Sequence, residues 1–183
     1  MKKILFFIIF VLHIPSIAQS TEGAMDCTVT GNVVVSSEEG KFKTYSGIQG
    51  GVKNNEILNL TYTVTSNSIY IKLKRDKTEN NTVIASYLSS SDVDTTAEKG
   101  KGGGFVLEQT KFNHSVSFTP DYIRIHEFKE LVISRYYKND WHGIYVYVSP
   151  LDLSTQTMTL NCRHTNDKMD TAFKTFNGFK SRK

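Results

Sequence analysis

Two cysteines, Cys27 and Cys162, lie near the two ends of a 183-residue chain, and an apolar leader precedes the first of them. Disulfides persist in oxidising compartments, and a leader that exports the chain would carry this pair into one. We therefore expect Cys27 and Cys162 to be bonded. The bond would hold the first and last segments of the folded chain side by side, which restricts the possible folds more than any other feature.

The leader has the layout of a signal peptide. Lys2 and Lys3 precede an almost continuous apolar run over residues 4–14, and Ser16 and Ala18 are the small residues of a cleavage site. The run is shorter than the roughly 20 residues that a spanning helix needs. We expect residues 1–18 to be removed and the mature chain to have no transmembrane segment. The protein is then periplasmic or secreted.

The charge of the mature chain is close to balanced. The whole chain has 22 basic and 18 acidic residues, so removal of Lys2 and Lys3 leaves 20 against 18, a net charge of +2. No long basic run follows the leader. Nucleic-acid binding depends on a concentrated positive charge, so we expect no nucleic-acid partner.

Apolar and polar residues alternate along much of residues 19–164, which predicts one β-domain. From Leu58 to Val64 the apolar residues take every second position, the signature of antiparallel strands with one buried face. The strands are expected at 27–35, 57–65, 69–74, 83–88, 105–108, 115–118, 122–126, 131–137, 144–148 and 157–163. Eight to ten such strands indicate an all-β, antiparallel up-and-down barrel, with a two-sheet β-sandwich as the alternative.

The alternation also places the cysteines. Cys27 shares a face with Val29 and Val33, and Cys162 shares a face with Met158. Both sulfurs are therefore expected on the core side, where they can meet if the terminal strands are neighbours. Residues 36–41 and 89–104 lack the alternation and are expected to be irregular.

The strand at 144–148 is expected to point Ile144, Val146 and Val148 inward and Tyr145 and Tyr147 outward. With Tyr70, these two tyrosines would form an exposed aromatic stripe. Such a stripe could contact a partner, but ordinary cross-strand pairing of tyrosines on a solvated sheet is the favoured explanation.

Residues 165–183 are expected to form a C-terminal helix and basic tail. Asn166 is the expected N-cap, and the apolar residues then follow the helical period at Met169, Ala172, Phe173 and Phe176. The helix is expected to pack this face on the β-domain. A membrane-surface or partner-binding helix is the alternative, but its basic residues would lie along the polar face.

The densest group of recognition residues lies between two predicted strands. It consists of Arg135, Tyr137, Asp140, Trp141 and His142. Aromatic and arginine side chains dominate binding hot spots, so this group is the predicted binding site. The alternative is that Trp141 folds over the end of the barrel as a plug.

No motif predicts catalysis, a metal or a cofactor. The histidines His114, His126, His142 and His164 are not spaced as metal ligands, and no activated serine elbow is present. We therefore assign no catalytic residue and expect no enzyme activity.

The predicted strand order resembles lipocalin-like barrels and the small exported barrels that inhibit lysozymes, in architecture alone. The Gly-x-Trp of lipocalins is missing, since Asn32 and Val33 follow Gly31. The function expected from the chain is that of an exported, disulfide-stapled binding or interaction module, including an inhibitor-like protein-binding barrel. A carrier of a small apolar ligand and an enzyme with a less obvious polar site stay open as alternatives.

Overall fold

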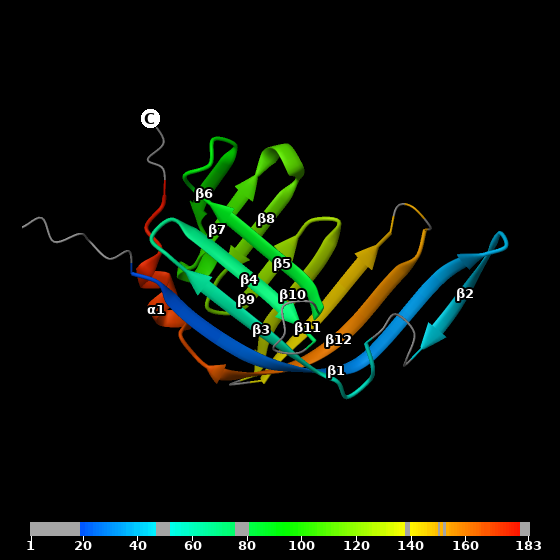
Figure 1. Ribbon diagram of the computed structural model, residues 1–183. Helices are drawn as coiled ribbons and strands as arrows, with labels where there is room; N and C mark the ends of the chain where they lie inside the picture. The colour runs from blue at the N-terminus through cyan, green and yellow to red at the C-terminus, as the bar shows by residue number, and fades with distance from the viewer. Residues whose placement is uncertain are drawn as a thin grey trace, which may run out of the picture.

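Twelve antiparallel strands and one short α-helix form the part of the chain that the computed structural model describes (Figure 1). The described residues are 19–46, 52–75, 81–137, 140–149, 151 and 153–179. The expected signal peptide, residues 1–18, therefore lies outside them. No helix within these ranges is long and apolar enough to span a membrane.

Every strand has defined bounds. They are β1 (Thr21–Glu38), β2 (Lys41–Ser46), β3 (Ile57–Val64), β4 (Ser68–Lys74), β5 (Thr82–Ser89), β6 (Thr95–Lys99), β7 (Phe105–Gln109), β8 (His114–Phe118), β9 (Tyr122–His126), β10 (Lys129–Tyr137), β11 (Asp140–Val148) and β12 (Thr155–Asn166). Short 3-10 turns, η2 (Lys101–Gly103) and η3 (Thr110–Phe112), flank β7, and the helix α1 spans Met169–Thr175.

The strands form one curved sheet in the order β5-β4-β3-β1-β12-β11-β10-β9-β8-β7-β6, with β2 paired to β1 alone. Most sequence neighbours pair as an up-and-down meander, with β2/β3 and β5/β6 as the exceptions, and the terminal strands β1 and β12 pair with each other. The sheet curls until β5 contacts β7 and β8, which nearly closes a barrel. The predicted antiparallel up-and-down barrel with a C-terminal helix is therefore confirmed, although the predicted number of strands was too low.

Both segments that were expected to be irregular contain strand residues. The first segment contains the end of β1 and a two-residue turn, in which Glu39 and Gly40 both have positive φ (52° and 74°). Two positive φ values are typical of the tight hairpin turn that leads into β2. The second contains β6, whose residues pair with β7 from Thr95 to Lys99. The residues of β6 are mostly threonine, glutamate and lysine, which are suitable for an edge strand. They do not alternate between apolar and polar, so the strand could not be recognised from that pattern.

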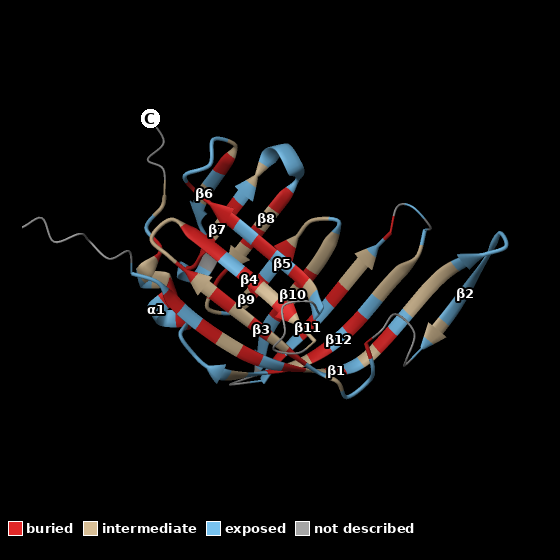
Figure 2. Cartoon of the chain, viewed as in Figure 1, coloured by how far each residue is buried: buried red, intermediate tan, exposed pale blue. Residues whose placement is uncertain are grey.

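Aromatic rings fill the barrel next to α1. Phe118 lies with its ring centroid 5.1 Å from that of Tyr62 and 5.5 Å from that of Phe105, and Phe176 stacks on Phe105 at 4.1 Å. Buried residues alternate with exposed ones along the strands around them (Figure 2). This end of the core is packed rather than hollow.

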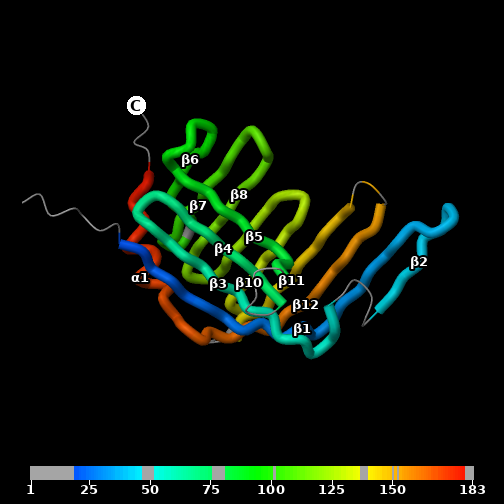
Figure 3. Tube along the Cα trace, viewed as in Figure 1, coloured from blue at the N-terminus to red at the C-terminus, as the bar shows by residue number. Residues whose placement is uncertain are grey.

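The helix closes this end of the barrel. Met169, Ala172 and Phe176 are buried, and α1 packs against β1 and β3 (Figure 3). The expected packing of the apolar face on the β-domain is thus observed. The prediction that Asn166 is the N-cap was wrong, because its amide donates to the Glu22 carbonyl. The carboxylate of Asp167 instead accepts the Met169 N–H at the start of the helix.

A β-bulge changes the side-chain parity of β1. The pairing of β1 with β12 shifts between Val29 and Gly31, so Asn32 rather than Val33 points into the core. An extra residue in one strand reverses every later side chain. Val33 was therefore assigned to the wrong face, although Cys27 and Val29 lie on the core side as expected.

The faces of β11 are the reverse of the expected ones. Tyr145 is 3% exposed, whereas Ile144 is 53% and Val148 is 47% exposed. Pairing with β12 sets this parity, since Gly143 lies opposite Leu160 and Tyr145 opposite Met158, and these partners are core residues. The expected stripe of Tyr70, Tyr145 and Tyr147 does not form, because Tyr145 is inside.

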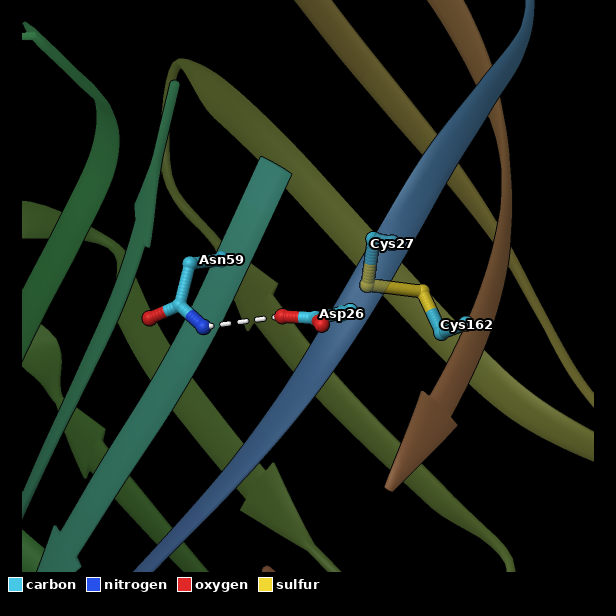
Figure 4. Close-up of a disulfide and its surroundings, with 4 residues drawn as sticks. All are labelled: Asp26, Cys27, Asn59 and Cys162. Carbon is cyan, nitrogen blue, oxygen red and sulfur yellow. Dashed lines mark hydrogen bonds between the residues drawn. A yellow bond between two sulfur atoms is a disulfide. The ribbon is translucent and has the colours of Figure 1, made fainter. Parts of the chain in front are cut away.

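The Cys27–Cys162 disulfide is present (Figure 4). The two cysteines lie directly opposite each other in the β1–β12 pair, and both are fully buried. On the third strand of this region, the Asn59 amide donates a 3.1 Å hydrogen bond to the carboxylate of Asp26, next to Cys27. The disulfide therefore joins β1 and β12, the first and last strands of the chain, at the middle of the sheet.

A buried polar pair spans the nearly closed seam of the barrel. Ser86 Oγ of β5 lies 2.7 Å from His114 Nε2 of β8, and both residues are buried. Burial lowers the pKa of His114 from its ordinary value of 6.5; nearby Glu127 opposes this shift and nearby His126 reinforces it. A neutral imidazole thus holds the seam at neutral pH.

Loss of the disulfide should weaken the fold. We expect a Cys27→Ala/Cys162→Ala variant to unfold with a free energy lower by about 2–5 kcal/mol, because the bond closes a long loop in the unfolded chain. Urea unfolding followed by circular dichroism measures this difference. Wild-type protein treated with reductant is the matched control, and an unchanged urea midpoint in both samples would contradict the expectation.

Lowering the pH should reduce the stability of the fold, because His114 at the β5–β8 seam becomes protonated. The folded-state pKa of His114 is lowered, so its contribution is complete above about pH 6.5 and is lost as the pH falls below that value. We expect His114→Gln, which keeps a partner for Ser86 but cannot titrate, to lose less stability than wild type between pH 7.5 and 5.5. Equal losses in the two proteins, measured by urea unfolding, would exclude this role.

Candidate functional site

A cavity of about 410 Å³ opens at the helix-covered end of the barrel. The ends of β10, β11 and β12 form one wall, and the start of α1 forms the other. The lining residues are Pro120, Arg135, Trp141, His164 and all of residues 167–171. This volume lies in the roughly 300–1,000 Å³ range of small-molecule sites.

Strand alternation positions the three barrel residues of the cavity. Arg135 continues the core-facing row that begins at Leu131 and Ile133 on β10, just beyond the packed core. Trp141 lies opposite both Arg135 and Cys162 in the sheet. His164 is the next core-facing residue of β12 after Cys162, so the cavity begins where the disulfide-bonded core ends.

Arg135 is held at the rim by Asp121. Its Nη2 lies 2.7 Å from Asp121 Oδ1, and its backbone N–H donates to the Asp121 carbonyl at 2.7 Å. Both side chains are substantially exposed to solvent. The pair is therefore a positioning contact, since exposed ion pairs contribute little to stability.

Trp141 forms the deepest part of the wall. It is 3% exposed, and its ring meets the His164 ring edge-on with centroids 5.3 Å apart. Within the described part of the chain, the indole N–H makes no hydrogen bond. The ring is recessed in the wall and offers little of its surface to the cavity.

His164 is the least satisfied polar side chain of the site. Its side chain is 13% exposed, and neither Nδ1 nor Nε2 has a hydrogen-bond partner among the described residues. Nδ1 lies 3.9 Å from Asp167 Oδ1, beyond hydrogen-bond distance. Burial lowers the pKa of His164 below its ordinary 6.5, and Asp167 opposes that shift. The imidazole is thus neutral at pH 7, and both of its nitrogens are enclosed in the protein.

Charges of both signs surround the cavity. Arg135 and Lys168 contribute positive charge, and Asp167 and Asp170 contribute negative charge. The Asp167 carboxylate also accepts the Met169 N–H, which fixes it at the start of α1. With a neutral His164, the four lining charges cancel.

A second cleft of about 450 Å³ adjoins this cavity. It shares His164 and Asp167 with the first and adds Asp140 and Arg163. The shared histidine lies between the two hollows, so they are parts of one larger recessed surface.

The predicted binding group is partly brought together. Arg135 and Trp141 line the same cavity, and Asp140 lines the adjoining cleft. His142 instead lies on the outer face, where its ring meets the Tyr136 ring at 5.8 Å. The side chain of Tyr137 lies outside the described residues. The buried Trp141 belongs to a strand and does not protrude as a recognition tip.

Sequence reasoning missed His164, Asp167 and Lys168. One signal could have identified His164, because it continues the core-facing alternation of Met158, Leu160 and Cys162 past the disulfide. Its acidic and basic neighbours at the start of the helix would then follow. The turn between β12 and α1 therefore belongs to the site.

The four histidines among the described residues lie in separate surroundings. His114 is in the seam, His126 lies beside Glu130, His142 faces outward, and His164 lines the cavity. Within the described ranges, no three His, Cys, Asp or Glu side chains gather as a metal site. The hydroxyl lining the cavity belongs to Thr171, which is exposed on the helix. The arrangement offers hydrogen bonds and shape, which are the requirements of a binding site.

Comparison of the chain with protein-family models, with curated proteins and with solved structures gives no significant match.

Proposed function

We propose that the protein is an exported binding module that holds a small polar ligand in the cavity formed by Arg135, Trp141 and His164. One observation carries the proposal: a cavity of about 410 Å³, within the size range of small-molecule sites, opens at the mouth of the barrel and is lined by these three residues together with the start of α1. Most of the lining side chains are polar or charged, so a polar ligand can form hydrogen bonds within the cavity.

The export part of the proposal rests on two features. The first 18 residues have the pattern of a signal peptide, and the mature chain contains a buried disulfide. Both are expected of a protein that works in the periplasm or outside the cell.

The packed core makes an apolar-ligand carrier the weaker alternative. Such a carrier needs a hollow barrel, whereas Tyr62, Phe105 and Phe118 fill the interior beside α1. The cavity at the mouth is lined mainly by polar side chains. It is also concave and contains a recessed Trp141, which suits a small ligand better than the broad contact of a protein inhibitor.

The cavity provides its own reporter, because Trp141 is the single tryptophan of the chain. We expect its fluorescence to change when a ligand from a panel of glutamate, lysine, maltose, diacetylchitobiose and laurate enters the site. Arg135→Ala should weaken that binding about tenfold, as expected for the loss of one charged hydrogen-bond donor. A fluorescence titration of the full mature chain measures both effects.

His142→Ala is the matched control, since His142 lies near the site in sequence but on the outer face of the sheet. It should bind with wild-type affinity. If no probe changes the emission, or if His142→Ala and Arg135→Ala weaken binding equally, the cavity is not the binding site.

A further inference from the structure

We infer that one end of the barrel docks on the surface of a lipid bilayer by inserting apolar side chains from its hairpin turns. This hairpin end consists of the five turns between β1 and β2, β5 and β6, β7 and β8, β9 and β10, and β11 and β12. The inference is independent of the proposed function, because the ligand cavity lies at the other end of β10, β11 and β12.

Antiparallel pairing places these turns side by side (Figure 1). Every second turn of a meander lies at the same end, so the β7–β8, β9–β10 and β11–β12 turns form a row. The β1–β2 turn continues the row, because Val35 near the end of β1 lies opposite Thr155 at the start of β12. The β5–β6 turn adjoins its other side, where the Thr110 N–H donates to the Asp94 carbonyl.

Each turn of the hairpin end carries a large apolar side chain that is exposed to solvent, within the turn or two residues after it (Figure 2). The exposed fractions are 68% for Phe42, 101% for Val93, 61% for Phe112, 63% for Phe128, 96% for Leu151 and 59% for Leu153. Among the described residues of the β3–β4, β6–β7 and β8–β9 turns, no large hydrophobic residue is exposed. Single exposed apolar residues are ordinary, whereas their concentration in the turns of one end marks an interaction surface.

Lysines accompany two of the aromatic rings. Lys111 Nζ lies 5.4 Å from the ring centroid of Phe112, and Lys129 Nζ lies 6.0 Å from that of Phe128. Within the described residues, neither lysine forms an ion pair. A lysine beside an inserted ring keeps its ammonium group at the level of the lipid phosphates, which accept hydrogen bonds from it.

The separation of the apolar side chains favours a bilayer over a protein partner. A protein interface is built around a contiguous core from which water is excluded, whereas side chains on separate turns can each enter a fluid bilayer interface independently. Glu39, Asp92 and Glu127 also lie at the hairpin end and offset its lysines. Apolar insertion rather than net charge therefore provides most of the attraction.

Docking through the hairpin end would orient the ligand cavity. The helix-covered end would then face the solvent, so the cavity beside Arg135 would stay accessible. Trp141 would remain outside the bilayer for the same reason.

Sedimentation of the full mature chain with vesicles tests the inference. The vesicles contain equal parts of phosphatidylcholine and phosphatidylglycerol. We expect the wild-type protein to bind them, and to stay bound at about 1 M sodium chloride, where the Debye length is only about 3 Å. The triple variant Phe112→Ser/Phe128→Ser/Leu151→Ser should bind at least about tenfold more weakly, because it leaves less apolar area to remove from water.

Tyr136→Ser is the matched control. Tyr136 is 84% exposed, but it lies near the other end of β10, where its ring meets that of His142. This variant should bind vesicles as wild type does. Urea midpoints of both variants show whether each is folded.

A gain of signal provides a second measurement that does not depend on lost binding. Phe112→Trp keeps an aromatic ring at the hairpin end, and vesicles of brominated lipid should quench the emission of the introduced indole. The emission of Trp141 in the wild-type protein should be unchanged by the same vesicles. The comparison shows which end of the barrel meets the lipid, even if the triple variant unfolds.

Several results would overturn the inference. They are no sedimentation of the wild-type protein with vesicles, release by salt, equal weakening by Tyr136→Ser and the triple variant, and quenching of Trp141 without quenching of the introduced indole. A wild-type dimer that the triple variant converts to a monomer, without vesicle binding, would assign the hairpin end to a second copy of the chain instead. The ligand titration tests the proposed function separately, so either proposal can fail alone.

Discussion

The pairing of β1 with β12 is the interaction on which the rest of the molecule depends. β1 is the longest strand, and it bonds to β3 and β2 on one side and to β12 on the other. The strands β3 to β5 and β6 to β11 are two meanders whose hydrogen-bonded ladders are connected through β1 and β12. Their apolar faces pack together in the core, where Tyr62 of β3 contacts Phe118 of β8. Cys27 and Cys162 lock the junction covalently. Without it, each meander would expose the apolar face that the other now covers.

The same junction determines the site. Because Cys162 lies opposite Trp141, the residue that follows on the core face of β12 is placed beside the indole, and that residue is His164. The chain then turns into α1, whose first residues form the far wall. A buried imidazole without partners is unfavourable for folding, and such costs are found where a surface is kept ready for another molecule.

Much of the fold could be predicted because the core-facing residues of antiparallel strands repeat with period two. The disulfide followed from that period, since both cysteines shared a parity with aliphatic neighbours. The prediction of which face of β11 is buried was wrong, because the core face carries Trp141, Gly143 and Tyr145 while Ile144 points outward. Hydrophobicity alone ranks the aliphatic face as the buried one. In the site, Arg135 and Trp141 were close in sequence and were found together. His164 was missed because strand pairing brings it there from far along the chain.

Pairing of the first and last strands has a consequence for chain connectivity. The sheet is a continuous strip whose centre holds the two chain ends and whose two free edges, β5 and β6, are joined by the short turn after Ser89. The turn from β5 to β6 connects two strands that do not pair with each other, so cutting the chain there would break no strand pair. A circular permutant that joins the old ends and opens the chain at this turn would keep every strand pair, and its gene order would follow the spatial order of the strip.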